Sequence, residues 1–118
     1  MKTRDVLQRY FDSLARRDDW ASCLADDVVF TSFTSPVKEA RGKQAFLEAT
    51  KRFYGTIAKV NVRDIIVDED RACALTHYEL QPTGGAAAFT SDVAEIFTVR
   101  DDRITSFAIY FDTAPFPK

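Results

Sequence analysis

The sequence predicts an α+β fold in which N-terminal helices lie on one face of a curved antiparallel sheet. In the first half of the chain apolar residues recur at helical spacing, whereas from Ile57 onward they alternate with polar residues. Helices that precede the strands favour α+β over a parallel, doubly wound arrangement. The chain has 118 residues, of which 46% are hydrophobic, so we expect one domain, residues 1–118, with one core.

Two helical segments are predicted near the N-terminus. Residues 3–17 predict an amphipathic helix with Thr3 as a candidate N-cap. Its apolar face consists of Val6, Leu7, Tyr10, Phe11 and Leu14. Residues 20–24 predict one or two further helical turns.

A strand and a longer helix are expected next. Residues 28–33 are rich in β-formers, and this run stops at Ser35-Pro36. Residues 43–54 predict a third helix, and Gly55 is placed to close it.

The second half predicts a four-strand antiparallel meander. Alternation breaks after Val62, so we expect a bulge near Arg63 and Asp64. Turns are predicted at residues 68–70 and 82–85, and Asp101-Asp102 predicts a tight hairpin between the last two strands.

The composition excludes several classes of protein. The net charge is -2 and the basic residues are scattered, so no nucleic-acid partner is expected. No apolar stretch approaches the roughly 18 to 20 residues of a membrane span, and the start does not resemble a signal peptide, so we expect a cytoplasmic protein with no membrane partner. Cys23 and Cys73 are expected to be buried thiols, and no metal site is expected because His77 and Glu79 lack a third ligand.

Glu95 is the most informative residue of the chain. It lies in an alternating apolar run with Val93, Phe97 and Val99, so its side chain is expected to point into the protein. A carboxylate held there is either an acid-base group or a structural one, for example a partner of Arg63. The sequence therefore indicates a small pocket with an ionisable group.

Several short stretches together resemble the nuclear transport factor two-like superfamily, in particular SnoaL-like polyketide cyclases and ketosteroid isomerases. These stretches are Gln8-Arg9-Tyr10, residues 17–20, residues 24–30, Arg41-Gly42 with Phe46, residues 97–104 and Tyr110-Phe111-Asp112. The resemblance implies a cone, the cystatin-like α+β barrel, in which the sheet curls around the helices and leaves an apolar cavity for a hydrophobic small molecule. It also implies that the outer face of the sheet makes a homodimer.

The resemblance implies roles for individual residues. Tyr10 falls where the isomerases place a tyrosine that hydrogen-bonds the developing oxyanion, although it could also be a core tyrosine. Glu95 falls where they keep a protonated carboxylic acid. The isomerase base has no counterpart, because residues 31–35 contain no acid. Asp112 matches the catalytic aspartate of the cyclases, although alternation places it beside Tyr110 on the opposite face, where it could instead cap the terminal segment.

His77 is the only histidine in the chain. If its side chain faces the inside of the sheet, it would be a proton shuttle at neutral pH. If it faces outward, it belongs with Glu79 to a surface that makes a dimer. We favour the outward position, because Tyr78 matches an aromatic residue that lines the cavity of the isomerases.

The aromatic residues are candidates for lining a cavity that holds a flat apolar ligand, or alternatively for filling the core. These residues are Phe30, Phe33, Phe53, Phe89, Phe97, Phe107 and Phe111, with Trp20 at the cavity's edge.

Two functions are compatible with these expectations. The first is a cofactor-independent isomerase, cyclase or dehydratase that acts on a hydrophobic carbonyl compound, with Glu95, Asp112 and His77 as proton carriers and Tyr10 as oxyanion donor. The second is a non-catalytic ligand-binding or dimerising module of the same fold, which predicts a narrow or filled cavity, no raised carboxyl pKa and a large apolar patch on the meander. In either case a homodimer is expected through Leu75, Ala94, Ile96, Ala108 and Tyr110.

Overall fold

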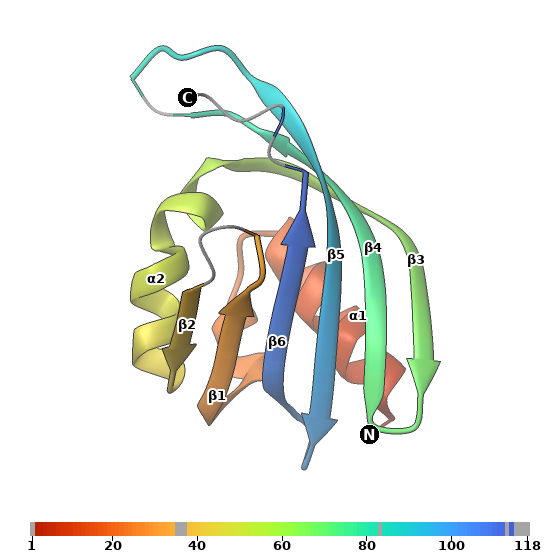
Figure 1. Ribbon diagram of the computed structural model, residues 1–118. Helices are drawn as coiled ribbons and strands as arrows, with labels where there is room; N and C mark the ends of the chain where they lie inside the picture. Colours follow the sequence, from red (N-terminus) through yellow and green to blue (C-terminus); the bar gives the residue numbers. More distant parts are fainter. Residues whose placement is uncertain (1, 35–37, 83, 113, 115–118) are drawn as a thin grey trace.

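The predicted α+β architecture is confirmed by a computed structural model, which describes residues 2–34, 38–82, 84–112 and 114. Helices precede most of the strands, and α1 lies behind a broad curved sheet while α2 lies beside its β2 edge (Figure 1). In chain order the elements are α1 (Thr3–Ala15), the 3-10 helix η1 (Trp20–Cys23), β1 (Leu24–Ser32), β2 (Lys38–Arg41), α2 (Lys43–Thr56), β3 (Ile57–Asp68), β4 (Arg71–Leu80), β5 (Phe89–Arg100) and β6 (Arg103–Phe111).

The strands form one sheet in the order β2-β1-β6-β5-β4-β3. The predicted antiparallel meander is confirmed as β3 to β6. β1 joins it by pairing in parallel with β6, and β2 pairs antiparallel with β1 at the sheet edge. The sequence analysis did not predict β2, whose residues are mostly charged and exposed.

Three register shifts and one turn shape the meander. The register of β3 against β4 shifts between Val62 and Asp64, which confirms the bulge predicted there. The other two shifts, between Ile57 and Lys59 of β3 and between Thr98 and Val99 of β5, were not predicted. Asp101 and Asp102 have φ angles of 50° and 62°, the two left-handed positions that a tight two-residue hairpin requires.

Some element ends differ from the prediction. The N-cap of α1 is Lys2, and Thr3 is already helical. Gly55 lies inside α2, which continues to Thr56, so it does not close the helix. β1 begins at Leu24, earlier than predicted, because this buried residue pairs with β6 ahead of a register shift that leaves Asp26 and Asp27 exposed. Ser35, Pro36 and Thr83, where a strand end and a loop were predicted, lie outside the described residues.

The core lies between the helices and the inner face of the sheet. The predicted apolar face of α1 is buried. On the sheet, Phe30, Phe107 and Phe97 occupy one row across β1, β6 and β5, and the rings of Phe97 and Phe107 are 4.4 Å apart. These aromatic rings pack against one another in the core.

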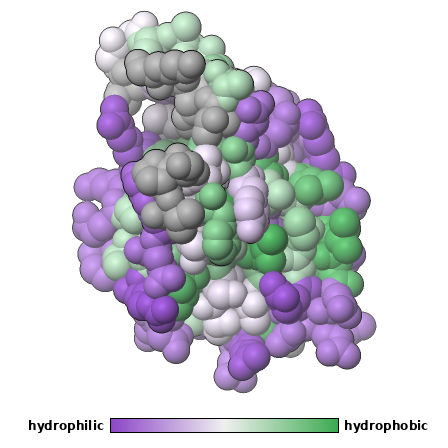
Figure 2. Space-filling model, viewed as in Figure 1, coloured by the Kyte–Doolittle hydropathy of each residue, from purple (hydrophilic) through white to green (hydrophobic). Residues whose placement is uncertain are grey.

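The outer face of the sheet exposes several large apolar side chains. Phe33, Ile66, Leu75 and Tyr110 are each 40 to 57% exposed. With the outer face toward the viewer, hydrophobic residues gather over the middle of the sheet and its β3 side, and hydrophilic ones surround them (Figure 2). Within the described part of the chain, no helix has the length and apolar character needed to cross a membrane.

Candidate active site

A cavity of about 300 Å³ opens between α2 and the inner face of the sheet. Its lining is mainly apolar, and the apolar residues are Phe30, Ala40, Ala49, Phe53, Val93, Phe107, Ile109 and Phe111. Polar side chains from five elements also line it, and these are Ser32, Lys38, Glu39, Thr50, Tyr54, Tyr78 and Glu95. Such a cavity is at the small end of the range for ligand pockets.

Glu95 lies at the buried end of this cavity and is only 2% exposed. The position follows from strand alternation, because Val93, Phe97 and Val99 of β5 are buried on the same face. This confirms the inward orientation predicted from the sequence. It also excludes the alternative of a pair with Arg63, whose guanidinium contacts Asp92 at 3.1 Å on the other face.

Two hydroxyl groups of β4 hold the carboxyl group of Glu95. The Tyr78 hydroxyl lies 3.0 Å from each carboxyl oxygen and the Thr76 hydroxyl lies 2.7 Å from Oε2. Burial disfavours the charged form and raises the pKa of Glu95 to about 7, although both hydrogen bonds act in the opposite direction. Near neutral pH this carboxyl group can therefore either give or take a proton.

The hydroxyl group of Thr76 suits both protonation states of Glu95. It carries one proton but has two oxygen neighbours, Glu95 Oε2 and the Val93 carbonyl oxygen at 3.2 Å. When Glu95 is ionised, Thr76 donates to the carboxylate. When Glu95 is neutral, its own O–H can donate to Thr76, which then donates to the carbonyl oxygen. The hydrogen bonds thus remain satisfied after proton transfer.

A pair of tyrosines from the two helices completes the buried end. The hydroxyl groups of Tyr10 on α1 and Tyr54 on α2 are 2.6 Å apart. Burial raises the pKa of both phenols, and the nearby charge of Glu95 contributes in each case, so both stay protonated donors. Tyr54 lines the cavity and Tyr10 does not. Tyr10, expected from the resemblance to contact a ligand oxygen, therefore lies behind Tyr54 and does not border the cavity.

Five of the aromatic residues predicted to line a cavity border it, and the others do not. Phe30, Phe53, Tyr78, Phe107 and Phe111 line the cavity.

Phe97 is fully buried in the aromatic row beneath the cavity. Trp20 packs its ring 4.3 Å from that of Tyr54 and so supports the cavity wall from behind. Phe33 lies on the outer face, stacked on Tyr110 at 5.0 Å, because its position alternates with the inward Ser32. Phe89 lies at the start of β5, outside the cavity lining.

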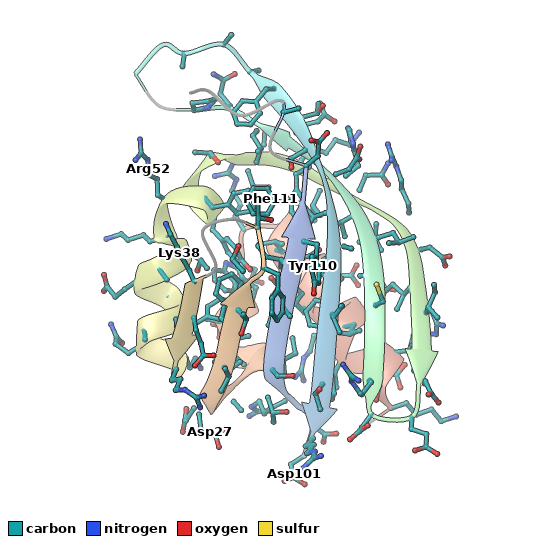
Figure 3. All side chains as sticks on the ribbon, in the orientation of Figure 1. Asp27, Lys38, Arg52, Asp101, Tyr110 and Phe111 are labelled. Atoms are coloured by element: carbon teal, nitrogen blue, oxygen red, sulfur yellow. The ribbon has the colours of Figure 1, made fainter. Side chains whose placement is uncertain are left out.

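Asp112 and His77, both expected as proton carriers, lie away from the cavity. Phe111 points into the cavity while Tyr110 lies on the front of β6, and Asp112 follows the outward alternation (Figure 3). Its carboxylate accepts from the Ala114 N–H at 3.0 Å, which is the structural alternative. The His77 ring lies on the outer face with Nδ1 2.7 Å from Asp92, as the favoured orientation predicted, so its role as a proton shuttle in the cavity is corrected.

Comparison with known proteins identifies the family of this chain. The family model described as the SnoaL-like domain matches residues 7–107. The chain belongs to the SnoaL-like domain family. No protein with a curated description matches its sequence.

Solved structures share the fold of this SnoaL-like domain at low sequence identity. An NTF2-like protein of unknown function from Burkholderia pseudomallei is 19% identical with a TM-score of 0.79, over 95% of this chain and 92% of its own. An LEH-like epoxide hydrolase from M. tuberculosis is 22% identical with a TM-score of 0.78, over 96% and 84%. A protein with a ketosteroid isomerase-like fold from Catenulispora acidiphila, in complex with trimethylamine, is 14% identical with a TM-score of 0.75, over 93% and 87%. These similarities show the fold of the SnoaL-like domain and not its chemistry.

The sequence analysis did not single out several polar residues in or beside the SnoaL-like cavity, among them Thr76, Tyr54 and Lys38. Thr76 and Tyr54 carry no pattern of their own, and only the packing of β4 and α2 against Glu95 reveals them. Lys38 belongs to the unpredicted strand β2. In the part of the chain that the structure describes, no three His, Cys, Asp or Glu side chains are grouped to hold a metal ion.

Proposed function

We propose that this SnoaL-like domain is an enzyme that moves a proton on a hydrophobic carbonyl compound, with Glu95 as the acid-base group. The observation that carries this proposal is a carboxyl group with a pKa of about 7 at the buried end of an apolar cavity. A general acid or base works best when its pKa lies near the working pH. Isomerases, cyclases and dehydratases of carbonyl compounds all depend on such a step.

The mechanism requires one base and one donor of hydrogen bonds. The ionised Glu95 takes a proton from the carbon next to the carbonyl group, so the C–H electron pair moves into the enolate and the charge appears on its oxygen. Tyr54 donates to this oxygen, and Tyr10 donates to Tyr54 through their 2.6 Å contact. The neutral Glu95 then returns the proton to the same carbon or to a conjugated one, which restores the carbonyl compound.

The cavity supports the enzymatic proposal over a purely binding module. The non-catalytic alternative predicts a narrow or filled cavity and an ordinary carboxyl pKa, whereas this cavity is small but open, with about 300 Å³, and the pKa of Glu95 is raised. Aromatic and aliphatic walls would exclude water from a bound ligand, which strengthens each hydrogen bond to the developing charge. The apolar outer face is compatible with either function.

Exchange of carbon-bound protons tests this proposal without knowledge of the natural substrate. β-Tetralone, a two-ring ketone, is incubated with the protein in deuterium oxide, and the loss of its α-proton signals is followed by NMR. We expect the wild type to catalyse exchange at a rate that rises as pH increases through about 7, because the ionised Glu95 is the base. Glu95→Gln should lower this rate by at least about 100-fold.

Two further variants complete the test: one is a control, and the other tests the role of Tyr54. Glu79→Gln changes an exposed carboxylate on the outer face of β4 and should leave exchange unchanged. Tyr54→Phe should slow exchange by roughly 10-fold or more, because it removes the donor to the enolate oxygen. Exchange by Glu95→Gln at the wild-type rate would contradict the proposal.

A further inference from the structure

The cavity has a second polar group of residues at its exposed side, formed by Lys38 of β2 and Ser32 of β1. The two residues are direct cross-strand partners, and both line the cavity. Side chains paired in this way lie about 5 Å apart at their Cβ atoms. An ammonium group and a hydroxyl group therefore stand side by side, and both can donate hydrogen bonds to one anion.

This donor pair and Glu95 lie in one row across the sheet. Lys38 pairs with Ser32, Ser32 with Ile109, and Ile109 with Glu95. At about 4.8 Å per strand spacing, three spacings separate the backbones of Lys38 and Glu95 by roughly 14 Å. The apolar side chain of Ile109 lies between the two polar ends. One ligand of one or two rings could thus meet both ends at once.

The charge of Lys38 is left uncompensated at this side of the cavity. Its neighbour Glu39 also borders the cavity, but its carboxylate pairs with Arg41 at 2.7 Å. Among the described residues, Lys38 itself has no ion-pair partner. Besides Lys38 and Glu39, the cavity lining contains one more acidic side chain, Glu95, at the far end of the row. The exposed side therefore favours an anion.

We propose that the substrate is an amphiphilic oxo acid, with an enolisable carbonyl group at Glu95 and a carboxylate at Lys38 and Ser32. This proposal rests on the proposed function for the identity of the reacting end. One ammonium and one hydroxyl group suit a singly charged carboxylate better than a phosphate dianion, which needs more donors. Lys38 then selects the substrate and fixes which end enters first, and it takes no part in the proton transfer.

Equilibrium binding of two matched probes tests the assignment. β-Naphthol carries a hydroxyl group in place of the enol oxygen, and the matching hydroxynaphthoate adds a carboxylate on the opposite ring. Dissociation constants are measured by fluorescence titration at low salt and at high salt. Because exposed ion pairs contribute modestly, we expect the wild type to bind the acid about two- to fivefold more tightly, with the preference lost at high salt.

Lys38→Gln should abolish this preference and leave the affinity for β-naphthol unchanged. Lys51→Gln, which removes an exposed charge from α2 outside the cavity lining, should preserve the preference. Equal affinities of the wild type for the two probes, no binding of either, or a preference that survives Lys38→Gln would overturn the proposal. Because binding needs no turnover, a Lys38-dependent preference without β-tetralone exchange would instead refute the proposed function alone.

Discussion

Glu95 couples the stability of the protein to pH, because its pKa is raised on folding. Below about pH 4.5 the carboxyl group is protonated in both the folded and the unfolded chain. Between about 4.5 and 7 the unfolded chain loses a proton that the folded chain keeps, so the free energy of unfolding falls as pH rises. The shift corresponds to about 3 kcal/mol, and above pH 7 the penalty stays constant.

Glu95→Gln removes this pH dependence, since the amide does not titrate. We expect the variant to gain stability relative to the wild type by about 3 kcal/mol between pH 4.5 and pH 7, as measured by urea unfolding at a series of pH values. Taking the difference between the two proteins cancels the contributions of all other groups. Glu79→Gln is the matched control. A constant difference across this range would contradict a raised pKa for Glu95.

Thr76 tunes the acid-base group, because its hydroxyl group stabilises the ionised carboxylate. Thr76→Val keeps the shape of the side chain and removes this donor, so the pKa of Glu95 should rise further above its wild-type value. NMR titration of the Glu95 carboxyl carbon measures the change, and the pH midpoint of β-tetralone exchange should move upward with it. Thr90→Val, at an exposed position of β5, should shift neither. An unchanged or lowered pKa in Thr76→Val would show that the hydroxyl group does not act on Glu95.

Part of the site was readable from the sequence and part was not. Glu95 could be placed because strand alternation is a local pattern, and its apolar neighbours fix the inner face. Tyr54 could not, since its role depends on how α2 packs over the sheet, and Thr76 could not, since its role depends on the register of β4 against β5. The family resemblance assigned Asp112 to the site, whereas strand alternation with Phe111 predicted that its side chain lies on the opposite face. The structure agrees with the alternation.

At the scale of elements, the connection from β2 into α2 depends on Gly42. This residue has φ 90° and ψ 151°, a backbone conformation that is essentially restricted to glycine. Its N–H donates to the Val28 carbonyl group at 2.7 Å, which links the start of α2 to β1. The conformation holds β2, and therefore Lys38, against the cavity.

Two glycine substitutions with opposite expected effects test this account. Gly42→Ala should lower the free energy of unfolding by about 1 to 3 kcal/mol, because alanine is strained at this φ. Gly55→Ala should raise it by about 0.5 to 1 kcal/mol, because Gly55 is helical and no atom lies within 4 Å of the added Cβ. Urea unfolding measures both. A loss of stability in Gly55→Ala would favour the helix-closing role first expected for this residue.

Elements with strong local patterns were predicted, whereas those that depend on distant pairing were not. The meander and its bulge follow from alternation and its interruption near Arg63. β2 is short and charged, and it becomes a strand only because β1 offers an unpaired edge. The Asp101-Asp102 turn could be read because few residue types accept two left-handed positions in succession.

At the scale of the whole molecule, the conical shape came from family resemblance and not from local patterns. The parallel contact of β1 with β6 joins segments more than 70 residues apart in the sequence, and no local pattern in either segment predicts this pairing. This contact brings Phe30 and Ser32 beside Phe107 and Ile109, so it builds one wall of the cavity. The wall is therefore a property of the fold, while its chemistry is a property of the residues placed on it.

We propose that two copies of the chain associate through the outer face of the sheet. Large apolar side chains are exposed on this face, and a second copy would remove them from water at a gain of about 25 cal/mol per Å². Leu75, which is 40% exposed, lies on β4 among the residues expected to meet the partner. A symmetric interface brings the same patch of both copies together, so one substitution changes it twice.

Leu75→Glu should convert the dimer to a monomer, because it places two buried and unpaired charges in the interface. Sedimentation velocity at micromolar concentration measures the mass of wild type and variant. Since Leu75 contributes little to the monomer's core, the variant should retain its far-ultraviolet circular dichroism and its cooperative unfolding. Ala45→Glu adds the same charge at an exposed position of α2 and should remain dimeric. A wild type that sediments only as a monomer would refute association through this face, and the exposed apolar side chains would then need another partner.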